Sequence, residues 1–130
     1  MLNVTTIRSD AIMVTEDGVK SITLPGLSHA SMRKYWGKAE TSRTCTYPVY
    51  ATNDNKVKRE MLEWLWKAAV QPVLQELGFY PKVNPLPRIW WIGVGLMAKA
   101  PIHAAGKFIK QGVPMATLHY CLPSYTSTIR

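Results

Sequence analysis

The sequence predicts an α/β fold in which helices cover both faces of a mostly parallel sheet. Three observations carry this prediction. Glu16-Asp17-Gly18 separates two strand-like runs, residues 56–77 show a helical period, and the apolar strand Arg88–Val94 leads directly into a glycine-containing turn. Strand-like segments that alternate with helical ones are typical of layered α/β domains.

The composition fits one folded domain in a reducing compartment. Of the 130 residues, 47% are hydrophobic, and only two are cysteines, Cys45 and Cys121, without a CxxC pair. We therefore expect no disulfide framework, no metal and no other cofactor. No apolar stretch approaches the roughly 20 residues of a membrane span, and Met1–Arg8 lacks the layout of a signal peptide. We expect a cytoplasmic protein with no membrane partner.

The net charge of +8 does not by itself indicate a nucleic-acid partner. The 16 Lys and Arg residues are spread from Arg8 to Arg130, and no run exceeds pairs such as Arg33-Lys34. Nucleic-acid binders concentrate basic residues along the phosphate path. The scatter argues against nucleic acid and leaves an acidic protein partner open.

The amino-terminal half predicts a hairpin and two helices. Residues 11–24 form a hairpin because Asp-Gly between β-branched runs favours a primed turn. Residues 28–39 form a short helix with Ser28 as its N-cap. Residues 56–77 form a longer amphipathic helix that Pro72 kinks or restarts. Gly78 is placed to end it.

The carboxyl-terminal half predicts a central strand, a helix and a second strand. Arg88–Val94 is apolar on both faces, as strands covered on both sides are. Pro101 begins a helix through about Lys110, and residues 113–122 form another strand. Ser124 caps a helix that comes after this strand.

His103 is the main candidate catalytic residue. Catalytic groups of open α/β sheets gather just past the carboxyl ends of strands, and His103 follows the central strand there. Imidazole changes protonation state near neutral pH, which suits a general base. The alternative is a helix-start histidine without a catalytic role. Ser124 and Tyr125 follow a strand end, where they would line a substrate pocket, although an N-cap explains Ser124 equally well.

Several segments in order resemble CHAT domains, caspase-like cysteine peptidase domains frequent in filamentous fungi. The segments are Met61–Trp66 with Pro72–Leu74 and Leu77–Phe79, then Leu86–Ile92, Pro101–Gly106 and Leu122–Ser127. The resemblance implies a partial caspase-like three-layer α/β/α sandwich, with residues 1–130 as its histidine-bearing portion. His103 falls on the family histidine.

Two departures from the family pattern bear on activity. The family's nucleophilic cysteine, in a Ser-Ala-Cys-x-Thr-like segment after a further strand, has no counterpart up to Arg130. Residues 93–100 replace the usual Pro-Thr-Gly-Pro-Leu. Cys121 shares a strand face with His119, but a core-facing thiol within a strand is usually inert, and the family places no nucleophile there. Cys45 is interpreted as a bystander.

The sequence leaves two functions of different class open. The first is a fragment of a CHAT-type cysteine endopeptidase that carries the general base His103 and is inactive alone. It is a truncated gene product, a partial gene model, or one part of an enzyme completed by another chain. The second is a non-catalytic CHAT-like protein-interaction module. A protein or peptide is the expected partner in both. An apolar strand left at a sheet edge also predicts that the isolated chain associates or is poorly stable.

Overall fold

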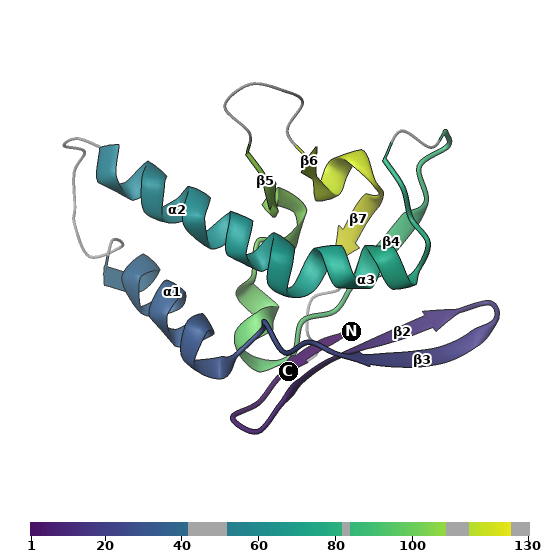
Figure 1. The fold of residues 1–130 in the computed structure, drawn as a ribbon, viewed down its shortest axis with the longest axis horizontal. Helices are drawn as coiled ribbons and strands as arrows, with labels where there is room; N and C mark the ends of the chain where they lie inside the picture. The colour runs from purple at the N-terminus through teal and green to yellow at the C-terminus, as the bar shows by residue number, and fades with distance from the viewer. Residues whose placement is uncertain (42–51, 82–83, 109–114, 126–130) are drawn as a thin grey trace.

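The computed structural model describes residues 1–41, 52–81, 84–108 and 115–125, and it shows a mixed α/β fold (Figure 1). The strands pair as an antiparallel sheet β1-β2-β3, a parallel pair β4-β7 and a small antiparallel pair β5-β6. Antiparallel pairings outnumber parallel ones here, so the predicted mostly parallel sheet is wrong for the described residues. The strands are β1 (Leu2–Val4), β2 (Ser9–Thr15), β3 (Gly18–Thr23), β4 (Arg88–Trp91), β5 (Gly106–Lys107), β6 (Met115–Ala116) and β7 (Leu122–Tyr125).

The helices are α1 (His29–Thr41), α2 (Thr52–Leu65) and α3 (Gln71–Glu76), with a π-helical turn η1 (Trp66–Val70) between the last two. Short 3-10 turns are η2 (Gly95–Lys99), η3 (Ile102–Ala104) and η4 (Thr117–His119). In Figure 1, α2 and α3 run end to end above the β2-β3 hairpin.

Strand β1 joins the hairpin sheet to the parallel pair. On one side it pairs antiparallel with β2, Leu2 lying opposite Ala11. On the other side the Leu2 N–H donates to the Ile92 carbonyl at 2.8 Å, and the Val94 N–H donates to the Leu2 carbonyl at 3.0 Å. The strands therefore follow one another in space as β3, β2, β1, β4 and β7.

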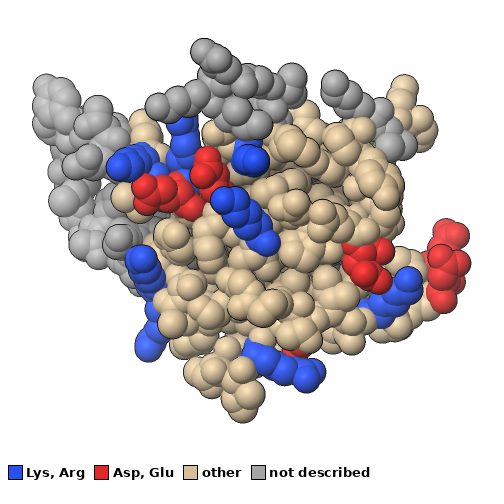
Figure 2. Space-filling view, viewed as in Figure 1, with Lys and Arg blue, Asp and Glu red and all other residues tan. Residues whose placement is uncertain are grey.

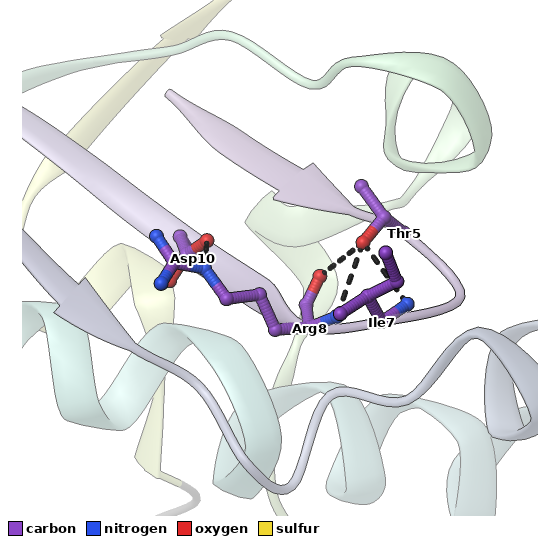
Figure 3. Close-up of polar contacts among 4 residues, drawn as sticks. All are labelled: Thr5, Ile7, Arg8 and Asp10. Atoms are coloured by element: carbon purple, nitrogen blue, oxygen red, sulfur yellow. Dashed lines mark hydrogen bonds and ion pairs between the residues drawn. The ribbon is translucent and has the colours of Figure 1, made fainter.

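A compact turn between β1 and β2 fixes the position of β1 (Figure 3). The Thr5 hydroxyl donates to the Arg8 carbonyl at 2.7 Å and accepts the Ile7 and Arg8 N–H groups at 3.3 and 3.1 Å. The Arg8 guanidinium also pairs with the Asp10 carboxylate at 2.8 Å. The Thr5 side chain thus supplies hydrogen-bond partners to the backbone of this turn. The turn lies at the surface, where Ile7 is 92% exposed.

The predicted hairpin is confirmed, with a shifted turn. Thr15 pairs with Gly18, so Glu16 and Asp17 form the two-residue loop, and Gly18 follows it with φ of 129°. Glycine is favoured there because side chains rarely adopt that φ.

The two helices predicted in the amino-terminal half are also confirmed, the second beginning at Thr52. Ser28 caps α1, its hydroxyl accepting the Ser31 N–H at 3.1 Å. Pro72 lies in the first turn of α3, directly after the π-helical turn, because proline cannot donate the usual helical hydrogen bond. Gly78, with φ of 68°, ends α3, and the Phe79 N–H donates to the Leu74 carbonyl at 2.9 Å. This is the glycine-ended helix terminus that the sequence predicted.

The core lies on one face of the strands. Ala11 and Met13 of β2 and Trp91 of β4 are buried there with the helices. On the opposite face Val14 is 77% exposed and Trp90 57% exposed. The prediction that both faces of the central strand are covered is therefore wrong for the described residues.

The elements after β4 differ from those predicted. The helix expected from Pro101 to Lys110 is only the short turn η3, followed by β5. The strand expected over 113–122 is β6 and η4 where it is described, and β7 begins at Leu122. Ser124 lies inside β7 and caps no helix. The misplaced boundary arose because Thr117–His119 has the β-branched and apolar composition of a strand but forms a 3-10 turn.

Candidate functional site

The chain leaves β4 through two glycines that allow a close turn. A Cβ at Gly93 would collide with the backbone carbonyl of Met97, and Gly95 has φ of 59°. Glycine at position 93 leaves room for that carbonyl. Glycine at position 95 adopts a φ that residues with a side chain rarely adopt. This turn leads through η2 into η3, which carries His103.

His103 is exposed, and its turn is anchored by a buried threonine. The Thr117 side chain is fully buried, and its hydroxyl lies 2.7 Å from the Ile102 carbonyl and 3.1 Å from that of Ala105. The Thr117 N–H also donates to the Ala105 carbonyl at 3.0 Å. Residues on both sides of His103 are thus tied to the segment that precedes β7, a link between distant residues that no local pattern showed.

Ser124 and Tyr125 lie in β7, beside β4. Ser124 is aligned with Trp90 and is half-buried, and Tyr125 is aligned with Trp91. The side chain of Tyr125 is outside the described residues. The hydrogen bonds that anchor the His103 turn run to Thr117 instead of Ser124.

Cys121 has the properties of a structural thiol. It is fully buried, and burial raises its pKa to about 11. The Trp91 indole N–H lies close enough to the sulfur to offset part of that rise, although it makes no hydrogen bond of ordinary geometry among the described residues. A thiolate is the reactive form, so Cys121 is a poor nucleophile. Cys45 lies outside the described residues.

His119 has a structural contact of its own. Its Nδ1 lies 3.2 Å from the Ala116 N–H, which donates to it across η4. Within the described ranges, no group of three or more His, Cys, Asp or Glu side chains could hold a metal ion. In the same ranges, no helix combines the length and apolar character that a membrane crossing requires.

A groove that the sequence did not indicate lies between β2 and β4. Its volume is about 750 Å³, and Val73 of α3 together with Leu77 and Phe79, which follow that helix, close its inner side. His103 is not among the residues that line it. Finding it from sequence would have required the register of β1, which depends on pairings between residues far apart in the chain.

The basic residues form no single patch on the face seen in Figure 2. Blue and red side chains are interspersed over α2 and over the hairpin, with uncharged surface between them. On this face, mixed charges of this kind are typical of a solvated surface and differ from a phosphate-binding stripe.

Comparisons with models of known families, with curated proteins and with solved structures find no match.

Proposed function

We propose that this chain is the histidine-bearing part of a CHAT-like, caspase-like cysteine peptidase domain, and that it is inactive by itself. The observation that carries the proposal is the exposed His103 in the turn after β4, one strand of the parallel pair β4-β7. The resemblance of residues 61–66, 86–92 and 101–106 to CHAT domains adds to it.

The catalytic cysteine of the proposed enzyme is not Cys121. A fully buried thiol with a pKa near 11 neither ionises near neutral pH nor meets a substrate. In the proposal a segment outside residues 1–130 supplies the cysteine, and the His103 imidazole accepts its proton as the thiolate attacks a peptide carbonyl.

Two surfaces suit such a complementing segment. Strand β7 pairs with β4 on one side and has no second neighbour among the described residues. Beside it, Trp90 and Leu122 are 57% and 46% exposed on the outer face. A strand that extends the sheet past β7 would pair the open backbone edge, and elements packed on that face would cover the apolar side chains.

The test uses the full chain, tagged and produced in the cells that naturally make it. A peptide acyloxymethyl ketone probe should label a cysteine outside residues 1–130, either later in the same polypeptide or in one that copurifies with it. Labelling should persist with His119→Ala, which removes another exposed histidine, and disappear with His103→Ala. Labelling that survives His103→Ala, or labelling of Cys121 itself, would contradict the proposal.

A non-catalytic interaction module is the second candidate. The observation that favours it is that Cys121, the cysteine within the described residues, is inaccessible. In that case the copurifying polypeptide would carry no probe-reactive cysteine, and His103→Ala would leave its binding unchanged.

A further inference from the structure

The groove between β2 and β4 exists because β1 is shorter than its two neighbours. Strand β1 begins at Leu2, opposite Ala11 of β2 and Gly93 beyond β4. Past that point β2 continues to Thr15, and β4 extends back to Arg88. Over these residues the two strands face each other across the groove of about 750 Å³.

Backbone groups of both strands point into the groove. Ile12 exchanges two hydrogen bonds with Met1, at 2.8 and 2.6 Å, so its N–H and C=O face β1. Strand groups alternate in direction, so those of Val14 face the same way. On β4, the Ile92 carbonyl accepts the Leu2 N–H, and alternation turns the N–H and C=O of Trp90 to the same side. The β2-β3 and β4-β7 pairings use the opposite edges of these strands, so these groups of Val14 and Trp90 have no backbone partner within the described residues.

The inner side of the groove is apolar. Val73 of α3, Leu77 just after that helix, and Phe79 line it, between Met13 of β2 and Trp91 of β4. Met13 and Trp91 are buried. A side chain inserted between them would therefore pack against the core of the protein.

We propose that this groove binds an extended segment of another polypeptide by strand addition, parallel to β4 and antiparallel to β2. The segment continues the register of β1. Its residue between Met13 and Trp91 points inward and is apolar, the residue before it pairs with Val14, and the one before that points inward again beside Ile89. The recognised chemistry is an extended backbone with uncharged apolar side chains at alternate positions.

The backbone groups of β2 and β4 favour an extended strand over other occupants of the groove. Backbone groups that an occupant buries must find partners, and an extended chain offers donors and acceptors on both of its sides at strand spacing. A helix satisfies its own backbone groups and would leave those of Val14 and Trp90 unpaired. The inferred site is separate from the proposed catalytic function because neither His103 nor a thiol takes part in it.

The test measures binding of a fluorescent peptide, blocked at both ends, with valine at alternate positions and threonine or lysine between them. Val14→Pro removes the N–H that faces the groove and should raise Kd about ten-fold or more, the loss of a buried backbone hydrogen bond. Val19→Pro is the matched control. Val19 is the cross-strand neighbour of Val14 and 69% exposed, and its N–H faces the outer edge of β3. Its Kd should be unchanged.

Amide hydrogen exchange on the unsubstituted chain gives a second readout that does not depend on a folded variant. Bound peptide should slow exchange at Val14, Trp90 and Ile92, and His103→Ala should not alter binding. Absence of binding, equal weakening by Val14→Pro and Val19→Pro, or protection along Leu122–Tyr125 instead would overturn the inference. So would a second copy of this chain occupying the groove, seen as dimerisation that Val14→Pro abolishes and the peptide cannot displace.

Discussion

At the scale of single residues, burial separates the chemistry of Cys121 from that of His103. The thiol is enclosed in the core, and its desolvation favours the neutral form. The imidazole lies on the surface in a turn held by Thr117. A reactive pair needs both groups accessible, so these two side chains do not form one. The sequence predicted an inert Cys121 because a core-facing strand was expected there. In the structure the physical reason is the burial of the thiol.

Cys121 should react slowly with iodoacetamide in the folded protein. Because burial raises its pKa to about 11, the thiolate fraction near neutral pH is small, and the alkylation rate should rise toward pH 11. Mass spectrometry of a Cys45→Ser variant isolates this thiol. Rapid alkylation at neutral pH without denaturant would contradict the buried position.

The same pKa shift predicts a loss of stability in alkali. A raised folded-state pKa means that the folded chain holds the thiol proton more tightly than the unfolded chain does. The stabilisation is therefore complete below the ordinary value of 9.0 and is lost as the pH rises toward 11. Urea unfolding measures the free energy of unfolding of the wild type and of Cys121→Ala. Over this pH interval the wild type should lose stability relative to Cys121→Ala. A difference independent of pH would exclude the thiol as the cause.

Thr117→Val should destabilise the protein by about 1–3 kcal/mol. The valine keeps the volume but loses the hydroxyl that bonds to the Ile102 carbonyl at 2.7 Å in the core. Thr117→Ser keeps the hydroxyl and serves as the control. Denaturant unfolding measures both, and an equal loss in the two variants would show that the methyl group, and not the hydrogen bond, stabilises this turn.

At the scale of elements, backbone constraints decide where strands end and turns begin. Pro72 and Gly78 act through local geometry, so the interruption and the end of the long helix were predictable. The arrangement of residues 115–125 was not, because Thr117–His119 has strand composition but is held in a 3-10 turn by Thr117, whose partners lie near His103. Tertiary hydrogen bonds override local preference there.

Gly93→Ala should cost about 2–3 kcal/mol or more, because the added Cβ would overlap the backbone carbonyl of Met97. Gly26→Ala is the control, since its Cβ would make only ordinary contacts with Ala68 at 3.4–3.5 Å. Thermal unfolding compares the two variants. A neutral Gly93→Ala would mean that the exit from β4 can widen without disturbing the core.

At the scale of the whole molecule, the strands carry a buried inner face and an outer face with several exposed apolar side chains. Val14 and Val19 are cross-strand neighbours and 77% and 69% exposed, and Trp90 is 57% exposed. Exposed apolar groups on one face mark an interaction surface or a cause of association. The expected association of the isolated chain remains a prediction.

Trp90→Lys should weaken self-association of the chain about ten-fold or more, since burying a large apolar side chain contributes roughly 1.5–3 kcal/mol. Ile7→Lys is the control, because Ile7 is 92% exposed but lies in the β1-β2 turn. Sedimentation velocity over a range of concentrations measures the change. A wild-type chain that stays monomeric at micromolar concentration, or equal effects of both variants, would contradict the assignment of this face.

Local sequence patterns were enough to predict the hairpin, the capped helix α1, the interrupted helix α2-α3 and the strand β4, because each depends on periodicity, capping or the backbone limits of glycine and proline. They also singled out His103 from its place after β4. The folded chain was needed to show that β1 lies between β2 and β4, that Thr117 holds the His103 turn, and that Cys121 is enclosed. These features depend on contacts between residues far apart in the chain, whose geometry no local pattern encodes.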